Sequence, residues 1–329
     1  MAEEQLRCVL VGAGSVGQIY GHHLQQGGAR VRYLVRSHYV ESARQGFTLH
    51  PFKWRSSTSQ RFVPDLVSDD LRTLIEDGVD VVVLCISYAG LRGAWLGDLM
   101  RQIGDATVFT LVPGHGAREL LLAHLSEPQL VTGMITLLGY PAPLPNQTLS
   151  EGTAYWFPPF MPCPIDGPKA RAQAIVDTLR AGGQPARRAA GLDGQSAWGT
   201  AALMPIVAGL EMHDWSFGRL SAEGSAATAS AIREALDLVA ASLERSPPLW
   251  RVAITGFTLR AALWFTPKLI PFSFEDFMAL HFQKVGAQTR LLMREWVALA
   301  DEGGLPIPNL RRHAAAIGSL CEDTTGSTG

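Results

Sequence analysis

Cysteine is scarce in this sequence, and neither sign of charge is in excess. The four cysteines are scattered, with no CxxC pair and no histidine cluster at ligand spacing, so neither a disulfide framework nor a structural zinc site is expected: Cys8, Cys85, Cys163 and Cys321. We therefore expect a reducing compartment, a cytoplasmic location and no metal. The formal net charge is -2, whereas a general nucleic-acid binder carries a large basic excess, so we expect no nucleic-acid partner. The acidic start of the chain also predicts no signal peptide.

An apolar run long enough to cross a bilayer is also missing. A membrane-spanning helix needs about 20 consecutive, mostly apolar residues. The most apolar long region, residues 249–272, is interrupted by three cations and two prolines: Arg251, Arg260, Pro267, Lys268 and Pro271. We expect this region to form an amphipathic, buried or interface-forming helix and the protein to have no membrane partner. Peripheral membrane contact is the weaker alternative.

The length and a change of pattern along the chain predict two domains. At roughly 150 residues per domain, 329 residues suffice for two. The first part alternates short apolar runs with helical patterns, which is typical of βαβ units and a mostly parallel sheet. Its predicted strands cover residues 6–11, 31–35, 79–86, 106–112 and 130–138. The second part is predicted to be all-helical, with helices over residues 197–212, 226–243 and 274–303.

A glycine-rich segment directly follows the first predicted strand. Residues 12–17 read GAGSVG, which is the GxGxxG pattern, and a helical pattern comes next. Such glycines permit a tight turn and a close approach of the backbone to a pyrophosphate at the helix N-terminus. The alternative is a merely glycine-rich turn. We predict an α/β fold with a Rossmann dinucleotide-binding domain over residues 1–192 and an all-helical domain over 193–329. The predicted cofactor contacts in the turn are Gly12, Gly14, Ser15, Val16 and Gly17.

The end of the second predicted strand favours NADPH over NADH. An NAD enzyme usually has an acid there for the ribose 2′-hydroxyl, whereas an NADP enzyme offers an arginine to the 2′-phosphate. Residues 29–40 contain three arginines and no carboxylate. Arg36 and Ser37 are expected to meet the adenosine ribose. Ordinary solvated arginines are the alternative, which suits Arg30 and Arg32 better than Arg36.

The segment from residue 12 to 49 resembles the opening of the ketopantoate reductase (2-dehydropantoate 2-reductase) family. It shares the glycine-rich turn, a Tyr and a Gly in the first helix, and a strand ending in Leu-x-Arg. Similarity continues through residues 81–88 and 113–116 and ends with the closing stretch at 304–309. The resemblance implies a Rossmann domain followed by a helical domain, with an α-keto acid reduced by NADPH in the cleft between them.

The same resemblance shows where the sequence departs from the family. The chain has only four lysines, and Ser196 is at the position of the family's catalytic lysine. Thr200 and Met204 are where its substrate-orienting asparagines are expected. Ser87 replaces a lysine after the fourth strand, and we expect it to contact the cofactor. Pro113 replaces an asparagine before the Gly-x-Gly. The cofactor half of the pattern is therefore present while the catalytic polar set is not.

Other residues are candidates for the acid of the reaction. Lys284 shares one face of the predicted helix over residues 274–303 with His281 and Gln288, since their spacing is i, i+3 and i+7. A solvated helix stripe is the alternative for these residues. His115 lies in the loop where the family approaches nicotinamide and substrate. We predict Lys284, His115 and Ser196 as the catalytic residues, and we expect His22 and His23 at the surface.

These observations predict an NADPH-dependent reductase acting on a keto or imino group of a specialised small-molecule substrate. The helical domain is rich in aromatic and Met side chains, most of them expected in its core, and a larger and more apolar substrate than ketopantoate is expected. The alternatives are a non-catalytic NADP(H)-binding protein of the same fold and a genuine 2-dehydropantoate 2-reductase with a relocated acid. A homodimer through the apolar helical domain is expected.

Overall fold

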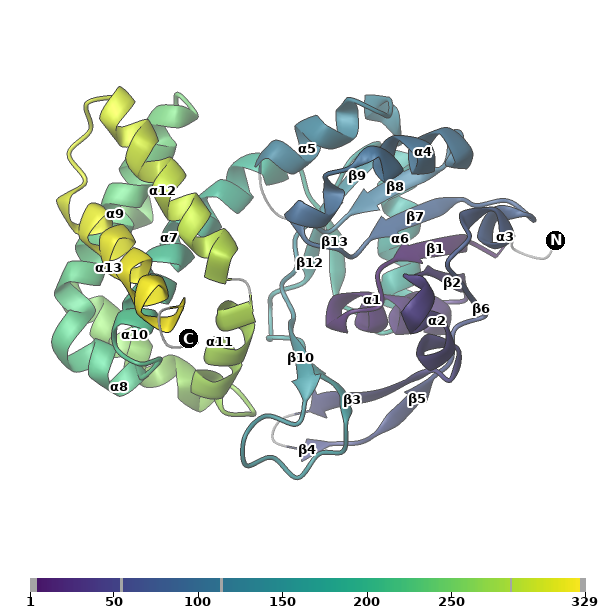
Figure 1. Ribbon diagram of the computed structural model, residues 1–329, viewed down its shortest axis with the longest axis horizontal. Helices are drawn as coiled ribbons and strands as arrows, with labels where there is room; N and C mark the ends of the chain where they lie inside the picture. The colour runs from purple at the N-terminus through teal and green to yellow at the C-terminus, as the bar shows by residue number, and fades with distance from the viewer. Residues whose placement is uncertain (1–4, 54–55, 113–114, 285, 326–329) are drawn as a thin grey trace. The chain divides into compact units, whose positions relative to one another are not determined.

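The computed structural model describes residues 5–53, 56–112, 115–284 and 286–325. The chain divides into two compact units, Met1–Ser196 and Ala197–Gly329 (Figure 1). The division falls inside helix α7 (Leu192–Met212). The functional domain boundary that we placed at residue 192 stays a prediction.

The first unit is built on an eight-stranded sheet with helices on both faces. The order of its strands is β13-β12-β9-β8-β7-β1-β2-β6, and the six strands from β9 to β6 are mutually parallel, while β12 pairs antiparallel with β9. The predicted Rossmann-like, mostly parallel sheet is therefore confirmed. In chain order the strands are β1 (Arg7–Val11), β2 (Arg30–Leu34), β6 (Leu66–Ser68), β7 (Val81–Leu84), β8 (Thr107–Thr110), β9 (Leu130–Gly133), β12 (Cys163–Asp166) and β13 (Ala186–Arg188). The helices are α1 (Ser15–Gln26), α2 (Ser37–Arg44), α3 (Leu71–Ile75), η1 (Tyr88–Leu91), α4 (Ala94–Ile103), α5 (His115–Leu122), η2 (Glu127–Gln129) and α6 (Lys169–Ala181).

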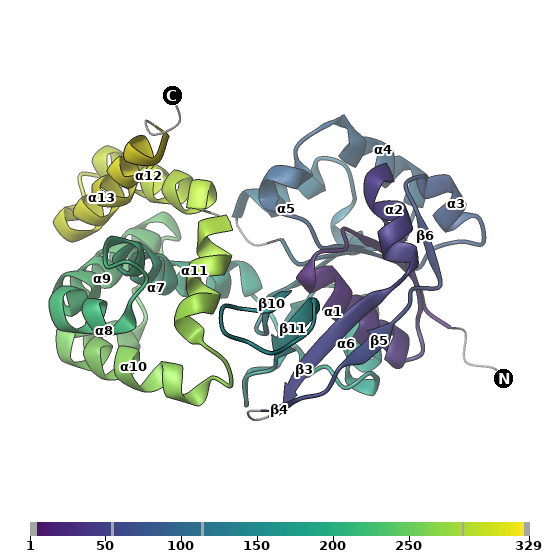
Figure 2. The same cartoon turned by 60° about the horizontal axis from the view of Figure 1, so that its bottom comes forward.

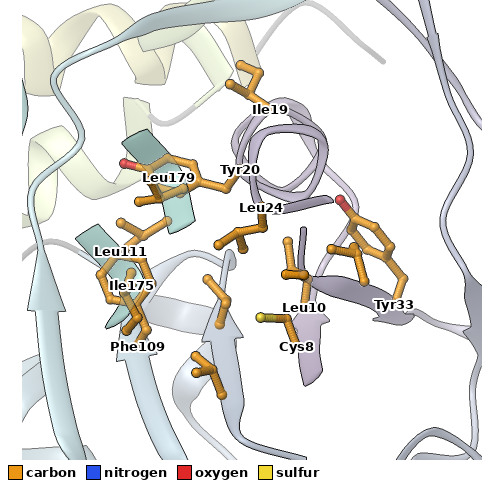
Figure 3. Packing of buried hydrophobic residues seen from close by; sticks show 14 of the residues in the cluster. Cys8, Leu10, Ile19, Tyr20, Leu24, Tyr33, Phe109, Leu111, Ile175 and Leu179 are labelled. Atoms are coloured by element: carbon orange, nitrogen blue, oxygen red, sulfur yellow. The ribbon is translucent and has the colours of Figure 1, made fainter. Parts of the chain in front are cut away.

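Helices cover both faces of this sheet, and the side chains on both faces are apolar. Successive side chains of a strand point to opposite faces, so Cys8 and Leu10 of β1 belong to one buried cluster and Val9 and Val11 to the other. Figure 3 shows the first cluster, in which Leu24 of α1 points toward the strands. Side chains from α6 and β8 complete it: Ile175, Leu179 and Phe109. This packing fixes α1 directly beyond the end of β1.

A second, five-stranded sheet was not predicted from the sequence. It joins β10 (Leu138–Ala142), β11 (Gly152–Trp156), β3 (Phe47–Lys53) and β4 (Ser56–Ser57), and β5 (Gln60–Phe62) pairs with β3. The proline-rich residues 138–166 contribute β10, β11 and, to the larger sheet, β12. Figure 2 shows β10 and β11 beside α1, which contacts both strands. The second sheet therefore supports the helix that follows the glycine turn.

The second unit is helical in the part of the chain that the structure describes. After α7 come α8 (Phe217–Arg219), the π-helix η3 (Leu220–Gly224), α9 (Ser225–Ser242), η4 (Leu249–Ala253), α10 (Gly256–Leu269), α11 (Phe274–Lys284), α12 (Gly286–Glu302) and α13 (Pro308–Thr325). Helix α9 contacts α10, α12 and α13. Among the described residues, no helix is both long enough and apolar enough to cross a membrane.

Two predictions for this unit are wrong. The single helix expected over residues 274–303 is two helices, α11 and α12. Glycine is a weak helix former, and Gly286 begins α12. Several aromatic side chains expected in the core are exposed instead, and these are Trp250, Phe257, Trp264 and Phe265.

Candidate cofactor-binding site

The turn after β1 has a backbone that only glycine adopts without strain. Gly12 has a φ of +98°, and its amide donates to the carbonyl of Leu34 at the end of β2 (3.1 Å). A Cβ at this position would lie 2.8 Å from the carbonyl oxygen of Cys85, directly after β7. Gly12 thus lies between the ends of β2 and β7, the two strands that flank β1, where a side chain would not fit.

The other two glycines of the motif shape the start of α1. A Cβ on Gly17 would lie 2.2 Å from the carbonyl oxygen of Gly12, so α1 packs directly against the turn. Gly14 is the N-cap, in extended conformation, and no side chain caps the helix. Because the first amides of a helix lack partners within it, this end can receive an anion. Ser15 and Val16, the first residues of α1, are half-buried.

Two side chains that the sequence analysis missed hold the turn in place. The Gln18 side-chain amide donates to the carbonyl of Ala13 (2.8 Å), and its oxygen accepts from the Thr153 hydroxyl of β11 (2.7 Å). Buried Tyr33 of β2 donates to the carbonyl of Gly17 (2.6 Å). A Cβ on Gly21 would lie 2.0 Å from the Tyr33 hydroxyl oxygen, which explains the glycine within α1.

The arginines near β2 have different environments. Arg30 forms an ion pair with Asp77. Arg32 is only 2% exposed and also pairs with Asp77, at 2.5 Å, so the expectation of a solvated Arg32 is wrong: its guanidinium is buried under α3 and also donates to backbone carbonyls there. Arg36, at the N-cap of α2, and Ser37 are exposed. Asp77 therefore engages Arg30 and Arg32, whereas Arg36 extends into solvent beyond the end of β2.

Ser87 lies after β7 but has a local role in the structure. Its hydroxyl accepts from the amide of Gly90 at 3.3 Å, which stabilises the turn into η1. The side chain is exposed. Cys85 and Ile86 pack against Gly12 of the glycine turn, and Ser87 is the next residue along the chain.

The predicted catalytic residues are spread over three elements. Lys284 is the last residue of α11 and is exposed, while Gln288 belongs to α12, so the trio with His281 does not share one helix face. His115 begins α5, and its side chain lies outside the described part of the chain. Ser196 is half-buried in α7. Their assembly into one site stays a prediction, since Lys284 belongs to the second unit and the others to the first.

The adjacent histidines of α1 are structural, and their expected surface position is wrong. His22 and His23 are each 7% exposed. The Nδ1 of His23 donates to the carbonyl of Gly182 (2.7 Å), and Nε2 accepts from the Tyr155 hydroxyl (3.0 Å). Burial lowers the pKa of His23 to about 4, although the bond to Gly182 opposes this shift. A neutral His23 therefore ties α1 to β11 and to the end of α6.

Comparison with known proteins identifies the region that contains this turn. Residues 8–143 match the family model described as ketopantoate reductase PanE/ApbA. Residues 8–143 therefore form a ketopantoate reductase family domain. The match includes the glycine turn, Arg36 and Ser87, which agrees with the resemblance seen in the sequence. No curated protein sequence shows a significant match to this chain.

Solved structures share the fold over nearly the whole chain. A PanE/ApbA family ketopantoate reductase from Ralstonia eutropha JMP134 is 19% identical, with a TM-score of 0.70, and the match covers 96% of this chain and 99% of that one. A 2-dehydropantoate 2-reductase from Geobacter metallireducens GS-15 is 16% identical (TM-score 0.68, 96% and 100% covered). D-Mandelate dehydrogenase with NADH and anilino(oxo)acetate is 13% identical (TM-score 0.64, 95% and 97% covered). At these identities the likeness establishes the ketopantoate reductase fold.

Proposed function

We propose that this chain is an NADPH-dependent oxidoreductase that reduces a keto or imino group. The observation that carries the proposal is the uncapped N-terminus of α1, which Gly12, Gly14 and Gly17 place against the ends of β1, β2 and β7. Backbone amides of Ser15 and Val16 would hold the pyrophosphate there. The reduced nicotinamide supplies the hydride when it is bound. The family of residues 8–143 supports this assignment.

NADPH is proposed over NADH because of the side chains that follow β2. Arg36 would pair with the 2′-phosphate and Ser37 would donate to it, since Arg30 and Arg32 are held by Asp77. Ser87 is proposed to contact the cofactor from the end of β7. The free thiols of Cys8, Cys85 and Cys163 are compatible with the proposed cytoplasmic location.

The proton that completes the reduction needs a donor from the chain. Hydride addition leaves negative charge on oxygen or nitrogen, which a positioned acid or hydrogen-bond donor must neutralise. We assign this task to Lys284, with His115 and Ser196 as further donors. In this proposal, residues 1–192 bind the cofactor, and residues 193–329 bind the substrate and form the homodimer contacts. A substrate larger and more apolar than ketopantoate is proposed because Ser196, Thr200 and Met204 replace the family's ammonium and amide groups.

The cofactor assignment is tested by titrating the protein with NADPH and NADH and following nucleotide fluorescence. Arg36→Ala is expected to weaken NADPH binding about tenfold or more and to leave NADH binding nearly unchanged, because a charge-assisted contact to phosphate contributes roughly 1.5–3 kcal/mol. Arg72→Ala, which removes another exposed arginine, is the matched control. Equal affinity of the unmodified protein for both nucleotides would contradict the proposal.

The catalytic assignment is tested by NADPH oxidation with 2-dehydropantoate, aryl α-keto acids and cyclic imines. On its best substrate, Lys284→Met should lower turnover by roughly 10²–10⁴, with NADPH affinity unchanged and Lys53→Met as the control. Wild-type turnover in Lys284→Met would contradict the role assigned to this lysine. NADPH binding without turnover would favour the non-catalytic protein, and efficient turnover of 2-dehydropantoate would favour the genuine reductase with a relocated acid.

A further inference from the structure

Helix α10 is apolar on two opposite faces. Leu259 and Leu263 are 7% and 4% exposed, and through them α10 packs on its own unit, where it contacts α8, η3 and α9. Figure 2 shows α10 at the edge of that unit. The opposite side, which we call the outer face of α10, follows the spacing i, i+4, i+7, i+8, i+11, i+12 of one helix stripe. It consists of Phe257, Ala261, Trp264, Phe265, Lys268 and Leu269.

The large apolar side chains of this outer face are exposed. Phe257 is 82%, Trp264 64%, Phe265 53% and Leu269 60% exposed, and η4, which leads into α10, adds Leu249 at 92% and Val252 at 78%. Together they offer on the order of 900 Å² of apolar surface, since an aromatic side chain alone buries about 150–250 Å². One partner of a stable protein interface contributes about 800 Å². Monomeric proteins rarely expose a contiguous apolar patch of this size, so another surface is expected to cover this face.

The charges around this face are already engaged within the chain. Residues 246–274 contain no Asp or Glu. The Lys268 ammonium lies 2.9 Å from the centre of the Trp264 ring. Arg251 pairs with Asp237, and Arg260 donates to the carbonyl of Ser221 (3.1 Å). Because these cations have partners of their own, an apolar surface fits the outer face better than an anionic membrane.

Two phenylalanines of the outer face lie equally far along the helix from one small residue. Ala261 has Phe257 four residues before it and Phe265 four residues after it. In an antiparallel pair of α10 helices, the two Ala261 residues would meet at the crossing point, where a small side chain lets the backbones approach. Phe257 would then face Phe265 of the partner subunit, and the reverse contact would occur across the two-fold axis. An interface between identical chains requires such self-complementarity.

We propose that a second copy of this chain covers the outer face of α10, with the two α10 helices antiparallel and crossing at Ala261. The proposed function includes a homodimer, and this inference rests on that part of it. The inference adds the surface through which the two copies bind each other. The chemistry of the interface is aromatic packing, in which each Phe257–Phe265 contact occurs twice.

A charge exchange tests both the surface and the register. Dimer dissociation is measured by sedimentation for the unmodified chain, for Phe257→Asp, for Phe265→Lys and for the double variant. Each single substitution places a charge in the interface twice and should raise the dissociation constant about 100-fold or more. In the double variant, each carboxylate introduced at position 257 meets the ammonium introduced at position 265 of the other chain, which should recover at least about tenfold of that loss. Positions 257 and 265 are two helix turns apart, so the pair does not form within one helix.

Matched controls separate the dimer from folding and from cofactor binding. Leu299→Asp, at an exposed leucine of α12 that is 41% exposed, should leave the dimer unchanged, and circular dichroism should report the same helix content for all variants. NADPH titration is carried out on the same samples. A dimer without NADPH binding would contradict the cofactor assignment and leave this inference standing. NADPH binding by a monomer would contradict this inference and the proposed homodimer and leave the cofactor assignment standing.

The outcomes that overturn the inference are specific. A monomer at about 100 µM, or single variants that dimerise as tightly as the unmodified chain, would exclude the outer face as the interface. A double variant no tighter than the single ones would exclude the antiparallel register. A monomer that sediments with phosphatidylserine vesicles in a manner dependent on Phe257 would assign the face to a membrane surface instead.

Discussion

Helix α1 of the first unit and helix α13 of the second have opposite arrangements at their N-termini. In the first unit, the glycine turn leaves the amides at the start of α1 without a capping side chain. In the helical unit, side chains satisfy polar groups of the helices: Glu234 accepts from the amides of Asn309 (3.3 Å) and Leu310 (2.7 Å) at the start of α13. There Glu211 also pairs with Arg290 at 2.5 Å. An open backbone site can thus be predicted from glycine spacing, whereas the polar side chains Glu234 and Glu211 have structural roles that the helical pattern does not indicate.

The largest loss of NADPH affinity and of stability is expected from a substitution in the glycine turn. Gly17→Ala forces a Cβ to within 2.2 Å of the Gly12 carbonyl, which should lower NADPH affinity roughly 100-fold through lost charge-assisted contacts and the free energy of unfolding by about 3 kcal/mol. Gly14→Ala is the control for stability, because a Cβ there meets no atom within 4 Å. Nucleotide titration and urea unfolding measure the two effects. Unchanged NADPH affinity in Gly17→Ala would place the nucleotide elsewhere.

A smaller effect, on the pH dependence of stability, is expected from buried His23, which holds α1 in place. Folding lowers the pKa of His23 from 6.5 to about 4, first through burial. As pH falls from 6.5 to 4, the unfolded chain takes up this proton while the folded one does not, so stability decreases in that window. At about 1.4 kcal/mol per pKa unit, His23 should account for about 3 kcal/mol.

The comparison of His23→Gln with His38→Gln isolates this contribution. His38 is exposed, so its variant should keep the full loss of unfolding free energy between pH 6.5 and pH 4. His23→Gln should show a flatter pH dependence in the same urea-unfolding experiment. Identical slopes for both variants would mean that His23 titrates normally in the folded protein.

The smallest loss of stability is expected from a substitution in the helical unit. Glu234→Ala leaves the Asn309 side chain and two amides at the start of α13 without their acceptor, which should cost about 2 kcal/mol of unfolding free energy. NADPH affinity should stay unchanged. Glu295→Ala, which removes an exposed carboxylate of α12, is the matched control. A loss of nucleotide binding in Glu234→Ala would show that the two units do not divide their roles as we propose.

The candidate site shows where prediction from sequence succeeds and where it stops. The turn at residues 12–17 follows from local rules, because glycines after a buried strand specify a backbone conformation. Gln18 and Thr153 are 135 residues apart, and no local pattern announces their contact. His22 and His23 look like surface residues on a polar helix end, yet α6 and the second sheet bury them. The expected long helix is two helices, and the second begins at Gly286, a weak helix former.

The sequence by itself determined the alternation of strands and helices, the parallel sheet and the dinucleotide turn, since these depend on periodicity and on the conformational freedom of glycine. Only the tertiary structure decided which charged side chains form ion pairs within the chain and which are exposed to solvent. Arg32 and Arg36 are four residues apart on one short segment, and one is buried against Asp77 while the other extends into solvent. The physical reason is that burial of a side chain depends on elements distant in sequence, which the local pattern does not contain.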